Sequence, residues 1–110
     1  MMIDLFKKRC VPCEGGMPPV TPEKVKELLS QVPQWRMEEG KVVRRFKFKN
    51  FKEAINFVNK VADLAEEEDH HPNISIYGWN KVKLTFFTHA IKGLSENDFI
   101  MAAKVNQITL

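Results

Sequence analysis

The chain has 110 residues, 44% of them hydrophobic and 28% charged, which is the size and composition of one soluble globular domain. Its net charge of +3 is small, and lysines and glutamates are interleaved, which argues against a nucleic-acid binder with a concentrated basic surface. No apolar run approaches the roughly 20 residues that cross a bilayer, and the N-terminus lacks the features of a signal peptide, so we predict a cytoplasmic protein without membrane contact.

Residues 1–20 are predicted to form a tail on a domain that spans residues 21–110. The tail contains both cysteines, Cys10 and Cys13, followed by glycines and prolines. The Cys-x-x-Cys spacing fits half of a zinc site or a redox pair. No second pair completes a four-cysteine site, and the residues that follow favour a loop over a redox-active helix. The sequence therefore predicts neither a metal nor a cofactor, and a metal-binding regulator stays an alternative.

The first helix is predicted to begin at Thr21-Pro22-Glu23. Threonine can cap a helix, proline is favoured at the first helical position, and glutamate suits the positive end of the helix dipole. Pro33 ends the helix. A hairpin follows, with a short strand from Trp35 to Met37 and a return strand from Lys41 to Lys49.

A long second helix is predicted to begin at Asn50-Phe51-Lys52-Glu53, a capping-box pattern. Because the residue before a proline avoids helical angles, the helix must end before Pro72, which leaves His70 near its end and His71 extended. The apolar stripe of this helix is the strongest periodic signal in the chain and should lie across a sheet. Its members are Phe51, Ala54, Ile55, Val58, Val61, Ala62 and Ala65.

Two more strands are indicated by alternating apolar residues over 73–77 and 81–88, with a turn between them. His89 follows the second of these strands. Ser95-Glu96-Asn97-Asp98 is another capping-box pattern and predicts the final helix. The order α-β-β-α-β-β-α predicts an α+β fold, a four-stranded antiparallel sheet with helices packed on one face. An exposed edge strand would favour a homodimer or homotetramer.

All three histidines fall at the ends of predicted elements. In an antiparallel hairpin the start of one strand lies beside the end of the next, so His71 and His89 should meet at one end of the sheet. Asp98 can return to the same place, and Glu66 lies one helical turn before His70. Such carboxylates would fix the tautomers of the imidazoles. The other carboxylates of this run, Glu67, Glu68 and Asp69, are expected to be solvated.

Two other interpretations of the histidines remain. Each one taken alone could be a polar connector or a surface residue. Three histidines could also hold zinc. Adjacent histidines on an extended segment, however, point to opposite sides, and the chain lacks the usual spaced pairs of histidine ligands. A metal-free acid–base pocket is therefore favoured.

The sequence resembles the pterin-4a-carbinolamine dehydratases. The match is carried by the run from Glu66 to Asn73, the aromatic Tyr77 or Trp79, the segment Asn80-Lys81-Val82, the pair Thr88-His89, and the run from Gly93 to Phe99. The similarity covers nearly the whole domain from Thr21 onward. It implies the loss of water from a 4a-hydroxytetrahydropterin to give quinonoid dihydropterin, within the recycling of tetrahydrobiopterin. It also implies a functional link to an aromatic amino acid hydroxylase.

The resemblance also implies roles for individual residues. His70, His71 and His89 match the active-site histidines, with His70 as the main general acid. Glu66 and Asp98 match the supporting carboxylates. The residues expected to bind substrate are Trp35, Pro72, Thr88, Ala90 and Ile91. Some animal members are also cofactors for the dimerisation of a transcription factor, so a non-catalytic binding module of the same fold is the alternative.

Overall fold

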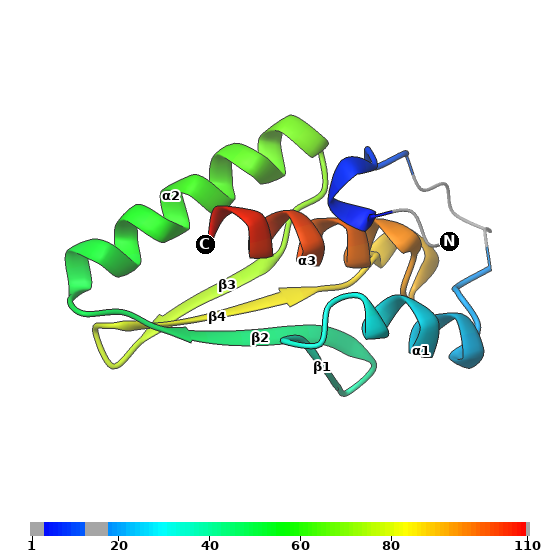
Figure 1. Cartoon of the computed structure of the whole chain (residues 1–110), viewed down its shortest axis with the longest axis horizontal. Helices are drawn as coiled ribbons and strands as arrows, with labels where there is room; N and C mark the ends of the chain where they lie inside the picture. Colours follow the sequence, from blue (N-terminus) through cyan, green and yellow to red (C-terminus); the bar gives the residue numbers. More distant parts are fainter. Residues whose placement is uncertain (1–3, 13–17, 110) are drawn as a thin grey trace.

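The computed structural model describes residues 4–12 and 18–109, and Figure 1 shows their arrangement. The helices and strands follow the predicted order, with two short 3₁₀ helices, η1 and η2, added. They are η1 (Leu5–Lys7), α1 (Pro22–Ser30), β1 (Arg36–Glu38), β2 (Lys41–Lys47), α2 (Phe51–Glu68), β3 (Asn73–Tyr77), β4 (Lys81–Phe86), η2 (His89–Ile91) and α3 (Glu96–Ile108). None of the described helices is both long and apolar enough to cross a membrane.

The four strands form one antiparallel sheet in the order β1-β2-β4-β3. This confirms the predicted α+β fold. The central pair is β2 and β4, where Arg44 lies opposite Leu84. The strand β3 is at one edge, and its five residues are all exposed. The helices α2 and α3 lie over the same face of the sheet (Figure 1).

The core lies between this face and the helices. Alternation in β4 places Val82, Leu84 and Phe86 under the helices, where all three are fully buried. Burying an apolar side chain of this size contributes about 1.5–3 kcal/mol to stability. Together with Val42 and Phe46 of β2 they form the floor on which α2 and α3 pack.

The predicted helix starts are confirmed. Thr21 Oγ1 accepts a hydrogen bond from the backbone N–H of Lys24 at 3.2 Å, and Asn50 Oδ1 accepts one from Glu53 N–H at 2.9 Å. Each bond satisfies an N–H group that lacks a partner within the first helical turn. The helix α2 ends where Asp69 takes a left-handed conformation, three residues before Pro72.

The buried stripe of α2 differs from the predicted one. Phe51 is exposed, and Phe57, which the prediction omitted, is buried with Ala54, Val61 and Ala65. Its next member in the same helical period is Glu68, which is also buried. A charged residue therefore completes the stripe at the end of the helix.

Candidate active site

The three histidines line one cavity of about 550 Å³. It lies where β3 begins and β4 ends, as predicted from the hairpin geometry. Thr88 and Ala90, two of the five residues expected to bind substrate, line the same cavity. The structure therefore brings together side chains from the end of α2, the segment after β4 and the start of α3.

His70 and Asp98 form the most buried pair of this site. His70 Nε2 lies 2.7 Å from Asp98 Oδ1; the histidine side chain is 12% exposed and the aspartate side chain is fully buried. Since an ionised carboxylate can only accept, Nε2 carries the proton that it donates to Asp98. The other ring nitrogen, Nδ1, is then the one that can exchange a proton with a substrate.

Asp98 is itself held by the first turn of α3. Its Oδ2 atom accepts hydrogen bonds from Thr88 Oγ1 at 2.8 Å and from the backbone N–H of Ser95 at 3.0 Å. The capping box pairs Asp98 with Ser95, as the sequence predicts. The positive end of the helix dipole favours a carboxylate at this position. Three donors and the dipole therefore compensate a charge that burial alone would penalise.

The prediction that Glu66 supports His70 is wrong. Glu66 Oε2 lies 3.0 Å from His71 Nε2, and the side chains of this pair are 79% and 55% exposed. The four-residue helical spacing fails because α2 ends at Glu68 and the left-handed Asp69 redirects the chain. An ion pair this exposed contributes little to stability.

His89 is exposed at the rim of the cavity and begins η2. Its ring packs edge-on against Phe87, with ring centres 5.2 Å apart. Among residues 4–12 and 18–109, no hydrogen-bond partner of the His89 ring is found, although its backbone oxygen accepts from Lys92 N–H at 3.1 Å. Its imidazole is therefore open to the cavity.

Trp35 does not form a wall of the cavity. It is only 2% exposed, lies in the core, and its ring is 5.6 Å from that of Phe86. Phe86 in turn stacks on His70, with ring centres 6.2 Å apart. Trp35 therefore supports the site through Phe86, because the core buries a large ring more favourably than the cavity rim does. Pro72 and the buried Ile91 also lie outside the cavity lining.

The sequence analysis missed one part of the lining. Arg9, Cys10, Val11 and Pro12 of the tail line the cavity, together with Asn97. Glu68 lines it as well, and the prediction that Glu68 is solvated is wrong. The seven-residue step from Val61 to Glu68 could have revealed this burial, because it places both on one helical face.

The metal interpretation names the three histidines or the pair Cys10 and Cys13 as ligands. Within residues 4–12 and 18–109, no cluster of three or more His, Cys, Asp or Glu side chains is placed to hold an ion. Cys13 lies outside the described residues. The Cys-x-x-Cys pair as a whole is therefore untested.

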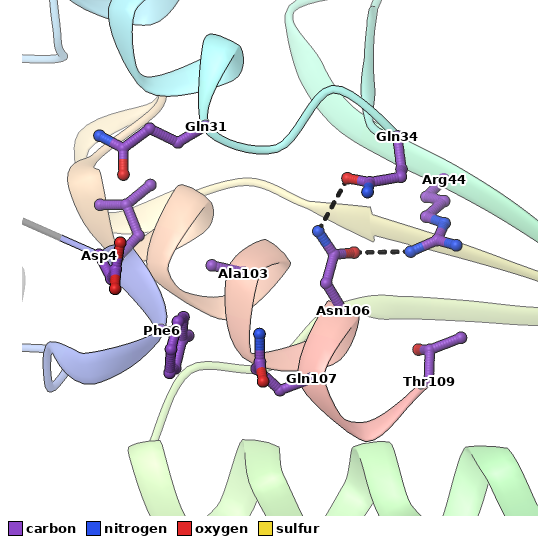
Figure 2. Close-up of a pocket in the computed structure, with 10 residues that line it drawn as sticks. Asp4, Phe6, Gln31, Gln34, Arg44, Ala103, Asn106, Gln107 and Thr109 are labelled. Atoms are coloured by element: carbon purple, nitrogen blue, oxygen red, sulfur yellow. Dashed lines mark hydrogen bonds between the residues drawn. The ribbon is translucent and has the colours of Figure 1, made fainter. Parts of the chain in front are cut away.

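Figure 2 shows the residues that line a second cavity, of about 340 Å³, between η1, α3 and the segment after α1. Asn106 of α3 lies in it. Its Oδ1 atom accepts hydrogen bonds from Trp35 Nε1 at 2.8 Å and from an Arg44 guanidinium nitrogen at 2.6 Å, and its amide donates to Gln34 Oε1. Burial lowers the pKa of Arg44, and no carboxylate pairs with it among the described residues. The network links β2 to α3 and leaves an arginine with a neutral partner.

Replacing Asn106 with aspartate is expected to stabilise the protein by about 1 kcal/mol, because a carboxylate would accept charge-assisted hydrogen bonds from Arg44. The exposed Gln34 amide turns so that its nitrogen, in place of its oxygen, faces the second carboxylate oxygen. Urea unfolding near pH 7 measures this gain. The added carboxylate becomes neutral in acid, so the gain should disappear as the pH falls. Asn106→Leu removes the acceptor and should destabilise. An Asn106→Asp variant no more stable than the wild type would contradict the expectation.

The antiparallel sheet, its one-sided helical layer and the histidine–aspartate pair define a small α+β protein with a histidine-lined cavity suited to proton transfer. A family model described as pterin 4 alpha carbinolamine dehydratase matches residues 18–108. The chain therefore belongs to that family, as its motifs predict.

Similar proteins and solved structures support this family assignment. Proteins of Rubrobacter xylanophilus and Methylococcus capsulatus, both named after the pterin-4-alpha-carbinolamine dehydratases, are 48% and 50% identical, over 97% and 94% of this chain and 100% and 92% of theirs. A crystal structure described as a transcriptional coactivator/pterin dehydratase from Brucella melitensis is 35% identical, with a TM-score of 0.75 over 82% of this chain and 97% of that one. A pterin dehydratase-like RuBisCO assembly factor of the α-carboxysome is 28% identical, with a TM-score of 0.58 over 68% and 88% of the two chains.

Proposed function

We propose that this protein is a dehydratase that removes water from a 4a-hydroxytetrahydropterin by histidine acid–base catalysis. The observation that carries the proposal is the His70–Asp98 pair, which opens onto a cavity that His71 and His89 also line. Membership of the family supports the substrate class.

The reaction needs two proton transfers and no redox step. The bond from C4a to the hydroxyl oxygen breaks, and an acid protonates that oxygen so that it leaves as water. A base removes the proton from the adjacent ring nitrogen, N5, and a double bond forms between C4a and N5. Imidazoles, with a typical pKa of about 6.5, can act as either acid or base near neutral pH.

Each histidine has a proposed part in this reaction. His70 is the general acid: in its protonated form Nε2–H donates to Asp98, and Nδ1–H gives its proton to the leaving hydroxyl. His89, at the rim, holds or protonates the hydroxyl from another side. The more exposed His71 helps to seat the pterin. Thr88 and Ala90 contribute to the wall beside His89.

The decisive experiment is a stopped-flow assay of carbinolamine decay in buffer, with the wild type, and with the His70→Ala and His89→Ala variants. The wild type should accelerate the decay beyond buffer, and both substitutions should reduce that acceleration. If the wild type gives the buffer rate, the protein is not this enzyme.

The proposed cellular setting follows from the substrate. A 4a-hydroxytetrahydropterin is the pterin product of aromatic amino acid hydroxylation, so a cytoplasmic hydroxylase is the proposed source and recycling of tetrahydrobiopterin the proposed purpose. The reaction as written needs neither a metal nor a cofactor.

A non-catalytic binding module is the second candidate. It is favoured by the two structural neighbours, one described as a transcriptional coactivator/pterin dehydratase and the other as a RuBisCO assembly factor. The stopped-flow assay separates the two candidates, because a pure binding module would leave the decay at the buffer rate.

We also propose that the protein forms a homodimer, or a tetramer of two such dimers, through β3. This edge strand exposes Ile74, Ile76 and Tyr77, and Trp79 follows in the turn. An exposed apolar edge is a template for pairing with a second copy. Light scattering after size exclusion should give at least a dimer for the wild type and half the mass of the wild-type assembly for Ile76→Lys. A monomeric wild type would contradict the proposal.

A further inference from the structure

The N-terminal tail lies beside the histidine cavity, although the tail and the histidines are far apart in the sequence. Its 3₁₀ helix η1 packs beside α3, as Figure 1 shows, with Leu5 buried in the core. Lys104 Nζ donates to the backbone oxygen of Phe6 at 3.0 Å. From this anchor the tail continues through Arg9, Cys10, Val11 and Pro12, all of which line the cavity.

Glu68 is the first side chain that holds this part of the tail. Its Oε1 atom accepts a hydrogen bond from the backbone N–H of Cys10 at 2.8 Å. Its Oε2 atom lies 3.3 Å from Arg9 Nε and 3.8 Å from Lys104 Nζ. The carboxylate is 2% exposed, so its charge is compensated by one tail cation and one α3 cation. This contact connects the tail to the end of α2, two residues before His70.

Asn97 is the second side chain that holds this part of the tail. Its Oδ1 atom accepts from the backbone N–H of Val11 at 3.0 Å, and its amide donates to the backbone oxygen of the same residue. One buried side chain thus binds both polar groups of one peptide residue, as a neighbouring strand would. Asn97 directly precedes Asp98, so the tail is fixed to the helix start that also holds His70.

We propose that Glu68 and Asn97 are positioning residues that hold the tail as an apolar wall of the substrate cavity. This inference rests on the proposed dehydratase function. Glu68 binds the backbone N–H of Cys10, and Asn97 binds both polar backbone groups of Val11. The side chains of Val11 and Pro12 therefore form the surface that the tail presents to a ligand. Val11 is 62% exposed, so its side chain is accessible to a ligand. Its ligand is the flat face of the pterin ring, which is the apolar part of the substrate.

The test separates holding the tail from binding the substrate. Amide hydrogen exchange of Cys10 and Val11 reports whether the tail is held, without any need for turnover. Asn97→Leu should accelerate exchange of the Val11 amide at least tenfold, and Glu68→Gln should do the same for Cys10 to a smaller extent. Asp63→Asn removes an exposed carboxylate from the same helix and should change neither amide.

Steady-state kinetics test whether Val11 contacts the substrate. Val11→Ser should raise KM about tenfold and leave kcat within about twofold, because an apolar contact equal in ground and transition states is lost. Val11 is exposed, so this variant folds even if Asn97→Leu does not. Unchanged exchange in both Asn97→Leu and Glu68→Gln would overturn the positioning role, and an unchanged KM in Val11→Ser would overturn the wall. A wild type without turnover would refute the dehydratase function and with it the substrate wall. Amide hydrogen exchange of Cys10 and Val11 would still test whether Glu68 and Asn97 hold the tail.

Discussion

His70→Gln is expected to lower kcat for carbinolamine dehydration by about 10²–10⁴-fold, the range that a positioned acid–base group contributes. Glutamine can still donate a hydrogen bond to Asp98, so the buried carboxylate keeps a donor where His70 Nε2 now lies. It cannot exchange a proton near neutral pH. The loss should therefore fall on kcat, measured by stopped flow at saturating pterin, with little change in KM.

His71→Gln is the natural comparison, since it makes the same change at the next residue. His71 is more than half exposed, and its ion-pair partner among the described residues is the exposed Glu66. Its replacement should cost less than about tenfold in kcat. If the two variants lose equal activity, or if His70→Gln keeps the wild-type kcat, His70 is not the main acid.

The fold could be predicted from the sequence because its signals are local. Alternation in β4, the Asn50 cap of α2 and the proline after His71 each determine an element without knowledge of the rest. The tail could not be predicted in this way. Its contacts with α2 and α3 join residues about 60 and 90 positions apart, and glycines and prolines in a sequence do not indicate where such a segment packs.

The site could be predicted in part, for the same reason. Hairpin geometry places His71 and His89 at one end of the sheet, and the capping pattern places Asp98 at the start of a helix. The choice of carboxylate partner depends on how the chain turns at Asp69, and helical spacing carries no information beyond the end of a helix. The burial of Trp35 depends on which of several large rings the core takes up, which is a property of the whole packing.

Asp98→Asn is expected to damage both activity and stability, and the reason lies in its three donors. The carboxylate accepts from His70 Nε2 on one oxygen and from Thr88 and Ser95 on the other. An asparagine side chain has one accepting oxygen and one donating nitrogen. If its nitrogen faces Ser95, two N–H groups oppose each other in a buried site, at a cost of about 1–3 kcal/mol.

If the nitrogen of that asparagine instead faces His70, the imidazole must accept at Nε2 and carry its proton on Nδ1. An imidazole that accepts at Nε2 cannot also be protonated there, so His70 cannot form the imidazolium that a general acid needs, and kcat should fall by about 10²-fold or more. Glu66→Gln is the matched control, because it also removes the carboxylate partner of a histidine, but at the surface. It should change the free energy of unfolding by less than about 0.5 kcal/mol. Urea unfolding and stopped-flow kinetics of both variants measure the contrast, and equal effects would refute the assignment of Asp98 as the residue that orients His70.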